Sequence, residues 1–570
     1  MKVKSTVAIL ECLLEQGVDT IFGYPGGTIL NIYDELYDYQ DKLHHILTAH
    51  EQGAAHAADG YARATGKVGV CFATSGPGAT NLTTGMATAY YDSSPVVFIT
   101  CNVTENLLGK DAFQEVDITG IAMPITKATY LVRDPQTIPD ILREAFAVAA
   151  TGRPGPVLID FLKNVTAPDV LIDYEPMERK EHIKHGRLHD LTRRIGWDIK
   201  TPEPNHDDIA LLADMIRAAE RPLLICGGGV VRGRAHEEFR ELAEKIDTPV
   251  AITVMGGGGF PGGHDLATGM IGMHGSQASN MACDNCDLLI AVGCRFSDRV
   301  ALDPDSFAIN AKIVHIDIDR AEIGKNVRTD HHIIGDAKRV LEILCQMVEP
   351  MEHTRWKNFV FAYPKRVAYE DRPDQLTPQQ VLETIRQLVP GDSIVSTDVG
   401  QHQMWTIQHF NFDYPGQLLT SGGFGTMGFG LGAALGAKVG CPDKTVLHIT
   451  GDGCFRMNGQ EMATESHYDI PVITFVFDNR TLGMVRQWQN LIYHKRFSQT
   501  DLDFAPDFVK LAEAYGLKGK RVTNVEELEG AIREALEWGH GYVVDCMIDT
   551  DEMVRPMVGG GQRITNFMLI

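Results

Sequence analysis

Two polar groups stand where two apolar segments of the C-terminal third end. The turn Gly451–Gly453 has Asp452 at its centre and follows the apolar run 446–450; Asn479 follows the run 472–477, 27 positions after Asp452. That separation fits one helix and one strand, and the carboxyl ends of parallel strands share one edge of a sheet. Glycines let the backbone approach a phosphate, and carboxylate and amide oxygens suit Mg²⁺. The pair therefore indicates a magnesium-diphosphate site, or else a capping aspartate in an ordinary turn.

Glu51 is a second candidate for chemistry. It follows the strand-like run 45–48 and opens an alanine-rich helix. A carboxylate at this place could simply be favoured by the helix dipole. It could instead be a catalytic carboxyl in a mostly apolar site, where burial favours the protonated form.

The middle of the chain has features of a nucleotide site. The segments 226–229 and 293–300 contain glycines and each follow a predicted strand, and Asp317 ends the strand 313–316. An acidic residue at a strand end could meet a ribose hydroxyl. Arg295 and Arg299 could hold a diphosphate, or could form surface salt bridges.

These residues need strands to position them, and the sequence supplies short, nearly continuous apolar runs separated by helical stretches. Such runs are typical of strands that are covered on both faces, and their alternation with helices predicts parallel sheets. The fold class is therefore α/β, with doubly wound parallel sheets. The predicted strands are 68–73, 96–99, 157–159, 223–225, 288–292, 313–316, 445–449 and 472–477.

Two polar, proline-containing stretches divide the chain into three domains. We expect linkers at 166–205 and 348–376, which leave blocks at 1–165, 206–347 and 377–570 with a C-terminal tail. A helix, a strand, a glycine turn and a second helix follow one another in both the first and the third block. This echo indicates a duplicated fold with two ligand-facing edges.

Composition disfavours several classes of function. The 570 residues include 75 acidic and 52 basic ones, for a net charge of -23, which disfavours nucleic acid and anionic membranes as partners. We expect no membrane span and no secretory signal. The eleven cysteines lie scattered in apolar runs, which suits reduced thiols in the cytoplasm; the pair Cys283 and Cys286 is interpreted as two buried thiols.

The spaced Gly-Asp-Gly and Asn479 resemble the thiamine-diphosphate signature, in which Asp478 takes the place of a usual first asparagine. Further motifs resemble the catalytic subunits of acetohydroxyacid synthases, also called acetolactate synthases, and together they cover nearly the whole chain outside the linkers. These motifs are FGYPGG (22–27), HEQG (50–53), TSGPGATN (74–81), DAFQE (111–115), RPGPV (153–157), GQHQMW (400–405), GTMG (425–428) and GMVRQW (483–488).

The resemblance implies roles for individual residues. Glu51 matches the glutamate that hydrogen-bonds the aminopyrimidine and favours its imino tautomer, which then takes the proton from C2 of the thiazolium. Asp452, Asn479 and the carbonyl of Thr481 match the Mg²⁺ ligands. Met427 matches the side chain that bends the cofactor. The other implied cofactor residues are Pro77, Asn81, Gly400, Gln401, His402, Gly425, Gly451, Gly453, Gly483, Met484 and Val485.

The substrate pocket and the flavin site are likewise implied by resemblance. Gly27, Phe113, Gln114, Lys163 and Trp488 match pocket and channel positions, although FLKN replaces the usual LPKD around Lys163. The run RFSDRV (295–300) resembles the FAD signature of the biosynthetic type, with Ser297 as a departure, and the flavin there is structural. The implied FAD residues are Gly227, Gly228, Gly229, Thr253, Met273, His274, Gly293, Arg295, Arg299, Asp317, Ile318, Gly335 and Asp336.

The implied activity joins pyruvate to a second 2-ketoacid, pyruvate or 2-ketobutyrate, with loss of CO₂. The resemblance also implies sites shared between two subunits, a homodimer or dimer of dimers, and a small regulatory subunit. Alternatives are a pyruvate oxidase, against which Trp488 and the RFSDRV run argue, and a glyoxylate carboligase, whose family lacks Glu51. A flavin- or nicotinamide-dependent dehydrogenase would leave Asp452 and Asn479 unexplained, and the intact motifs count against a silent scaffold.

Overall fold

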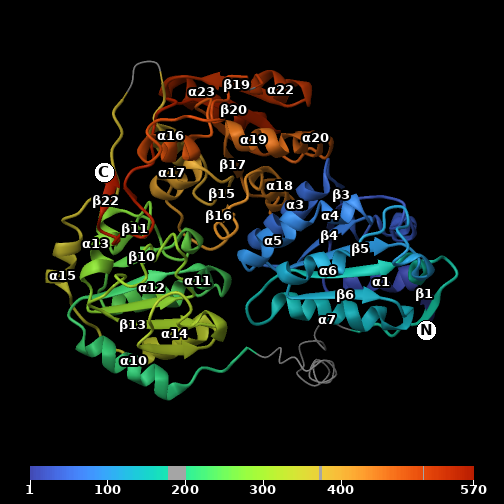
Figure 1. The fold of residues 1–570 in the computed structure, drawn as a ribbon, viewed down its shortest axis with the longest axis horizontal. Helices are drawn as coiled ribbons and strands as arrows, with labels where there is room; N and C mark the ends of the chain where they lie inside the picture. The colour runs from blue at the N-terminus through green and yellow to red at the C-terminus, as the bar shows by residue number, and fades with distance from the viewer. Residues whose placement is uncertain (178–200, 372–374, 505, 570) are drawn as a thin grey trace.

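A computed structural model describes residues 1–177, 201–371, 375–504 and 506–569. Figure 1 shows three α/β units: the N-terminal unit in blue and cyan, the central unit in green and yellow, and the C-terminal unit in orange and red. Each is built on a six-stranded parallel sheet, which confirms the predicted fold class. The part of the linker 166–205 that spans 178–200 lies outside the described residues.

The N-terminal sheet has the strand order β3-β2-β4-β5-β7-β6. Helices α1 and α7 cover one face and α3 covers the other, beside α5. A short antiparallel pair, β1 (Lys2–Lys4) with β8 (Leu171–Asp173), joins the start of the chain to the end of this unit. The other elements are β2 (Thr20–Tyr24), β3 (His44–Leu47), β4 (Gly69–Ala73), β5 (Val96–Asn102), β6 (Ala128–Val132), β7 (Val157–Leu162), α1 (Ser5–Glu15), α2 (Leu30–Leu36), α3 (Glu51–Thr65), α4 (Pro77–Thr80), α5 (Thr83–Tyr91), α6 (Ile118–Ala122) and α7 (Ile138–Ala150).

The C-terminal sheet has the order β16-β15-β17-β18-β20-β19. Numbered from its own first strand, this is the same order as in the N-terminal sheet, so the echo in the sequence does reflect a repeated fold. Its elements are β15 (Ile394–Thr397), β16 (Leu418–Thr420), β17 (Val446–Gly451), β18 (Ile473–Asp478), β19 (Lys518–Val522), β20 (Tyr542–Met547), α16 (Pro378–Leu388), α17 (Gln401–His409), α18 (Gly430–Gly440), α19 (Asp452–Asn458), α20 (Met462–His467), α21 (Gly483–Leu491), α22 (Phe508–Ala514) and α23 (Val525–Trp538).

The central sheet differs, with the order β11-β10-β9-β12-β13-β14. Numbered from its own first strand this is 3-2-1-4-5-6, the order of dinucleotide-binding sheets, in which ligands gather where the strand order reverses. Its elements are β9 (Pro222–Cys226), β10 (Val250–Ile252), β11 (Ala267–Met270), β12 (Leu288–Val292), β13 (Lys312–Asp317), β14 (His331–Ile334), α10 (His206–Ala218), α11 (Gly228–Arg232), α12 (His236–Lys245), α13 (Gln277–Asn285), α14 (Ala337–Met347) and α15 (Thr354–Val360).

The N- and C-terminal units pack through α3 and α18, and small residues allow the helices to approach closely. A Cβ at Gly436 would lie 1.8 Å from the carbonyl oxygen of Ala57, and one at Gly60 would lie 2.1 Å from that of Ala433. Alanines of both helices belong to one buried apolar cluster. A larger side chain at either glycine would push the helices apart, so this contact fixes how the two units sit on each other.

Two segments that lie outside the central sheet in the sequence pack against the central unit: helix α15 and the C-terminal tail. Helix α15 lies in the range expected as a linker, and its Trp356 and Val360 pack into the apolar core of the central unit. The C-terminal strands β21 (Met557–Val558) and β22 (Phe567–Leu569) form an antiparallel pair beside the same unit (Figure 1). Val558 N–H donates to the carbonyl of Met273 over 2.8 Å, which ties the tail to the loop that follows β11.

Candidate active site

The N-terminal candidates all follow strands of one sheet. Gly27 follows β2, Glu51 follows β3, Pro77 follows β4, the loop of Phe113 and Gln114 follows β5, and Lys163 follows β7. These five strands are neighbours, so the loops gather at the carboxyl edge of the sheet, where ligands bind in open α/β folds.

Glu51 is the first residue of α3 and is half-buried. Its Oε2 accepts a hydrogen bond from Asn81 Nδ2 over 2.9 Å. A Cβ at Gly78 would lie 3.1 Å from Glu51 Oε1, so the glycine leaves room for the carboxylate. Asn81 therefore fixes one carboxylate oxygen, and the other remains next to the glycine turn after β4.

The remaining N-terminal candidates are close to this turn or exposed. Gln114 has a left-handed backbone (φ 59°), and a Cβ at Gly76 would lie 2.9 Å from its Cα. Phe113 is 87% exposed, and Lys163 is exposed at the start of a 3-10 turn. Among the described residues, no neighbouring atom lies within 4 Å of a Cβ built on Gly27. In a single chain, Phe113, Lys163 and Gly27 are therefore exposed to solvent.

The C-terminal candidates gather at the corresponding edge of the other repeated sheet. Gly400 to His402 follow β15, Gly425 and Met427 follow β16, Asp452 follows β17, and Asn479 follows β18. A Cβ at Gly451 would lie 2.9 Å from His402 Nδ1, so the absence of a side chain lets the ring close over the turn. Burial lowers the pKa of His402 to about 4, which leaves a neutral imidazole at neutral pH.

Asp452 has the donor set of a metal ligand. It is 2% exposed, its Oδ1 accepts from Gly453 N–H over 2.8 Å, and its Oδ2 is buried with no hydrogen-bond partner among the residues that the structure describes. Burial, together with the nearby carboxylate of Asp478, raises the pKa of Asp452 above its ordinary value. A buried carboxylate oxygen without a partner is costly unless a cation or proton meets it, so the site fits Mg²⁺.

Asn479 and Thr481 complete this edge. Asn479 is 6% exposed, and its Oδ1 accepts from Thr481 N–H over 3.2 Å. Its Nδ2 donates to Gln401 Oε1 over 3.2 Å, and Gln401 Nε2 donates in turn to Gln487 Oε1 over 3.0 Å. Gln487 accepts from and donates to the backbone of Val554. A chain of buried amides thus joins the proposed metal ligand to the C-terminal segment.

Met427, Met484 and Val485 differ in their surroundings. A Cβ at Gly453 would lie 3.9 Å from Met427 Cε, which places this methionine beside the Asp452 turn. Met484 and Val485 are on the first turn of α21, and Val485 is 48% exposed. A Cβ at Gly483 would lie 2.0 Å from Gln401 Oε1. Glycine at the start of α21 is therefore needed for the amide contact of Asn479 with Gln401.

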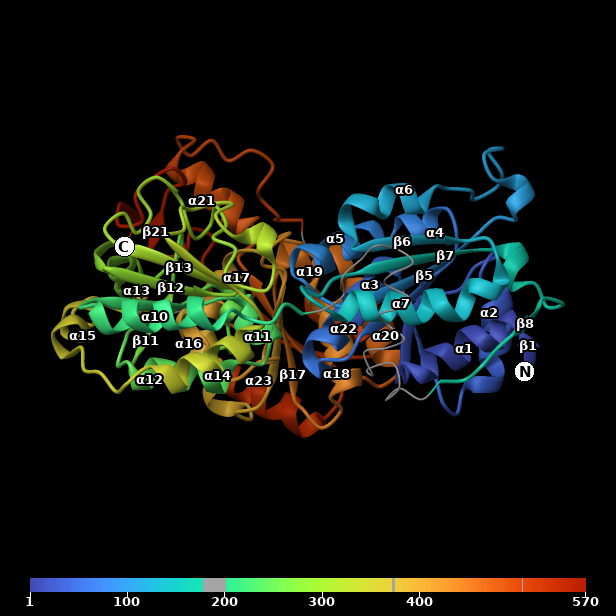
Figure 2. The same cartoon turned by 90° about the horizontal axis from the view of Figure 1, so that it is seen from below.

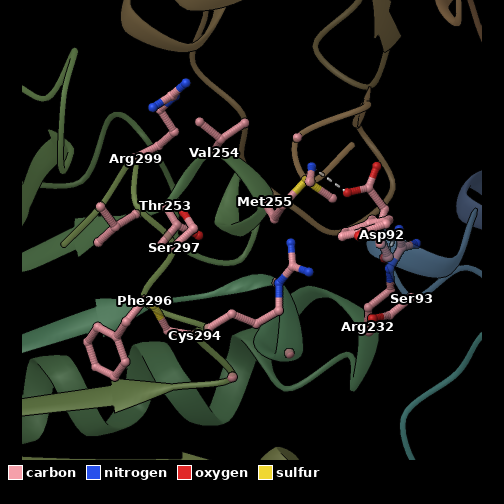
Figure 3. A pocket seen from close by; sticks show the side chains of 18 of the residues that line it. Asp92, Ser93, Arg232, Thr253, Val254, Met255, Cys294, Phe296, Ser297 and Arg299 are labelled. Atoms are coloured by element: carbon pink, nitrogen blue, oxygen red, sulfur yellow. Dashed lines mark hydrogen bonds between the residues drawn. The ribbon is translucent and has the colours of Figure 1, made fainter. Parts of the chain in front are cut away.

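The carboxyl edge of the central sheet opens into a cavity of about 800 Å³ (Figure 3). Every residue implied for FAD lines this cavity except Gly227, and Gly400, Gly425, Met484 and Trp488 line its other end. Gly227 packs next to it, since a Cβ there would lie 2.1 Å from the carbonyl oxygen of Gly293. The cavity has the Rossmann-type strand order beneath it and is large enough for an extended ligand.

The two arginines of the RFSDRV run differ. Arg299 forms an ion pair with Asp298 at 2.9 Å, and its side chain is 65% exposed. Arg295 is half-buried, and a Cβ at Gly423 would lie 2.7 Å from its Nη2, so its guanidinium reaches the loop after β16. Asp317 lies 9% exposed at the end of β13, where its Oδ1 accepts from Asp319 N–H. Arg295 is thus the arginine that faces the junction of the central and C-terminal units.

The sequence interpretation missed a buried charge cluster at this junction. Arg63 binds Asp59 through two hydrogen bonds, of 2.7 and 2.8 Å, and contacts Asp92 at 3.2 Å. Asp92 Oδ1 accepts from Gly423 N–H over 2.7 Å, and Arg232 Nη2 donates to the Asp92 carbonyl over 3.2 Å. Figure 3 shows Asp92 and Arg232 across the cavity from Thr253 and Ser297. The i, i+4 spacing of Asp59 and Arg63 is the sequence signal that could have revealed part of this cluster.

Comparison with known proteins assigns this chain to a family. The models of the thiamine pyrophosphate enzyme family match in order: the N-terminal TPP binding domain at 4–121, the central domain at 209–344, and the C-terminal TPP binding domain at 398–546. This chain belongs to the thiamine pyrophosphate enzymes.

Within that family the chain is similar to acetolactate synthase large subunits over almost its full length. It is 48% identical to a probable acetolactate synthase large subunit of Methanocaldococcus jannaschii, with 99% of this chain and 95% of the relative covered. It is 45% identical to the acetolactate synthase large subunit of Corynebacterium glutamicum, over 97% and 88%, and 41% identical to the isozyme 3 large subunit of Escherichia coli, over 97% and 96%. These matches show that the chain is a member of the acetolactate synthase large-subunit family.

In this thiamine pyrophosphate enzyme the two cofactor-binding units present their candidate residues at separate edges of one chain. The described cavity contains neither Glu51 nor Asp452. It joins the residues implied for FAD to Gly400, Gly425 and Met484, which are implied for the thiamine cofactor, and to Trp488. No helix in the described parts of the chain is long and apolar enough to cross a membrane.

Proposed function

We propose that this chain is the catalytic large subunit of an acetolactate synthase. It decarboxylates pyruvate and joins the remaining two-carbon unit to pyruvate or 2-ketobutyrate, giving 2-acetolactate or 2-aceto-2-hydroxybutyrate and CO₂. This is the first common step in the synthesis of valine, leucine and isoleucine. The observation that carries the proposal is the full-length similarity to acetolactate synthase large subunits, at 41–48% identity for the relatives named above.

The residues have distinct tasks in this proposal. When bound, thiamine diphosphate supplies the electron sink for decarboxylation. Asp452, Asn479 and the Thr481 carbonyl would hold Mg²⁺, because Asp452 offers a buried oxygen that has no partner among the described atoms. Glu51 holds or releases a proton at the aminopyrimidine, with its Oε2 fixed by Asn81. Met427 and Met484 shape the apolar contact surface for the cofactor.

The central cavity is the proposed FAD site. Its support is the 3-2-1-4-5-6 strand order, the cavity of about 800 Å³ and the placement of the implied residues around it. The reaction has no net redox change, so the flavin is structural in this proposal. A flavin that substrate reduces stoichiometrically would favour the alternative, a flavin-dependent dehydrogenase.

We further propose that each active site uses two chains. Glu51 of one chain faces Asp452 of a second, since a single chain presents these residues at two separate edges. Several apolar side chains beside these edges are exposed and would be covered by a second chain: Phe113 at 87%, Val485 at 48% and Phe424 at 46% exposed. A homodimer or dimer of dimers follows, together with a small regulatory subunit as the name "large subunit" implies for the relatives. We place the reaction in the cytoplasm, where the free cysteines stay reduced.

The decisive assay is formation of acetolactate from pyruvate by the purified protein. We expect product only when thiamine diphosphate and Mg²⁺ are both present, and little product from Glu51→Gln. A holoenzyme that decarboxylates pyruvate without forming acetolactate would contradict the proposal.

Mixed dimers test the two-chain site. Homodimers of Glu51→Gln and of Asp452→Ala should both be inactive. A dimer with one chain of each kind should regain activity, because one of its two sites combines an intact Glu51 with an intact Asp452. If each chain instead builds its own site, the mixed dimer stays inactive.

A further inference from the structure

Glu461 is a buried glutamate of the C-terminal unit whose side chain contacts the N-terminal unit. It ends the 3-10 turn Gly459–Glu461, directly after α19, and it is fully buried. Its Oε1 accepts from His50 N–H over 3.0 Å, and its Oε2 accepts from Ala49 N–H over 3.1 Å. Thr464 Oγ1 also donates to Oε2, over 2.7 Å. One side chain therefore collects three donors, two of them from the other unit.

The two N–H groups belong to the turn that carries Glu51. Ala49 and His50 connect β3 to α3, and His50 caps the helix by accepting from Gln52 N–H at its Nδ1. The N–H groups of Ala49 and His50 precede the helix, so the helix itself gives them no acceptor. The carboxylate of Glu461 fills that role.

Local packing agrees with this role. A Cβ at Gly53 would lie 2.0 Å from Glu461 Oε1, so glycine at 53 is what lets the carboxylate reach the turn. Burial raises the pKa of Glu461, whereas Thr464 and the two backbone donors favour its charged form. Hydrogen bonds to a carboxylate are stronger than neutral ones, and a buried carboxylate with three donors is held in one place.

We propose that Glu461 is a positioning residue for catalysis, which holds the turn 49–50 so that the Glu51 carboxylate keeps the orientation its proton transfer requires. This rests on the proposed function only in giving Glu51 its role. Tyr468 adds a second contact, since its hydroxyl accepts from Leu47 N–H over 2.9 Å. Glu461 and Tyr468, which flank α20, thus hold the Glu51 turn from the C-terminal unit of the same chain.

The first experiment compares Glu461→Ala and Glu461→Gln with Glu465→Gln. Glu465 is a buried glutamate on α20 whose carboxylate accepts no hydrogen bond from residues 47–53 in the described part of the chain, so it is a matched control. In the cofactor-free protein, we expect amide hydrogen exchange at both Ala49 and His50 to rise about tenfold or more in Glu461→Ala, because each N–H loses its acceptor, and to rise at one of the two in Glu461→Gln, which keeps one acceptor oxygen. The control should leave it unchanged.

The second measurement is proton exchange at C2 of bound thiamine diphosphate, which needs no pyruvate. A misplaced catalytic group can cost about 10²-fold, so we expect Glu461→Ala to slow this exchange by about 10- to 100-fold. Glu461→Gln keeps one acceptor oxygen and should fall between Ala and wild type. The Mg²⁺ concentration for half-maximal cofactor binding should not change.

C2 exchange within twofold of wild type in a folded variant would overturn the proposal. So would an equal loss of Mg²⁺ affinity, because Glu461 would then act through α19 and Asp452.

Mixed dimers separate these two routes further. In the dimer of Glu51→Gln and Asp452→Ala chains, the active site uses Glu51 from the Asp452→Ala chain. Adding Glu461→Gln to that chain should slow the surviving site, and adding it to the Glu51→Gln chain should not. The opposite pattern would overturn the proposal.

If the mixed dimer has no activity, the two-chain site fails, and the C2 exchange rates of the homodimers still decide the role of Glu461. An acetolactate assay that fails with wild-type protein leaves the C2 measurement readable, so the two proposals fail separately.

Discussion

Asn479 and Gln401 face each other through their side-chain amides, with Asn479 Nδ2 donating to Gln401 Oε1 over 3.2 Å. This contact turns the amide oxygen of Asn479 away from Gln401. The oxygen is the atom that a hard cation would bind. Gln401 therefore acts on the proposed metal ligand without itself being one, and its own position is fixed by Gln487 and the carbonyl of Glu552.

Gln401→Leu should lower the affinity for Mg²⁺. Groups that orient a metal ligand typically contribute about 10- to 100-fold in affinity, and we expect a loss in that range. The measurement is cofactor binding titrated with Mg²⁺. Gln417→Leu is the control, because Gln417 is also buried and hydrogen-bonded, to Gly391 and Ser393, but lies on the approach to β16. An equal shift in both variants would mean that the effect is general destabilisation.

Arg295→Ala should weaken retention of the flavin with little effect on folding. Arg295 lines the central cavity and reaches the loop of Gly423, so its charge is available to an anionic ligand there. The ratio of flavin to protein after gel filtration measures the effect. Arg320→Ala is the control, because Arg320 is exposed and does not line the cavity. Wild-type flavin content in Arg295→Ala would contradict the assigned role.

The sequence predicts the sheets well because their strands are buried on both faces. The run 288–292 is β12 residue for residue, and the other predicted strands overlap the observed ones. Parallel strand ends meet at one edge, which is why the sequence spacing of Asp452 and Asn479 could predict that they lie together: β17 and β18 are neighbours. Periodic burial carries this information in the sequence itself.

The residues that support the candidate site leave no such pattern. Glu461 and His50 are 411 positions apart, and their contact depends on how two units pack. Gln487 appears in the sequence as one polar residue of an amphipathic helix, although it is 2% exposed and bonded to the C-terminal segment. Helix α15 lies in a polar, proline-containing range, so composition hid the burial of Trp356. Contacts between distant segments follow from the fold and not from local periodicity.

Asp160→Asn should change how stability depends on pH. Burial raises the pKa of Asp160 to about 6 from 3.8, even though Thr100 and Asn102 donate to it. Between these values the folded chain keeps a proton that the unfolded chain has lost, so the stability that Asp160 contributes is full below about pH 4 and is lost as pH rises through about 6. The asparagine cannot titrate. Thermal unfolding midpoints measured from pH 4.5 to 7.5 should therefore fall more steeply for wild type than for the variant. A gap between the two chains that does not vary with pH would contradict this.

Trp488→Leu should reduce selectivity for 2-ketobutyrate over pyruvate as the second substrate. Trp488 lines the cavity near Met484, on α21, and offers a large apolar surface there. 2-Ketobutyrate has one more methylene than pyruvate; burying it is worth about 0.8 kcal/mol, and pockets discriminate one methylene by about 1–3 kcal/mol. We expect a loss of selectivity of roughly tenfold, at about 1.4 kcal/mol per factor of ten.

In the experiment, both ketoacids are supplied together and the two products are quantified. Trp538→Leu is the control, since Trp538 ends α23 and does not line the cavity. An unchanged product ratio in folded Trp488→Leu would mean that the indole only packs against its neighbours, in the apolar cluster that it shares with Phe567 of the tail.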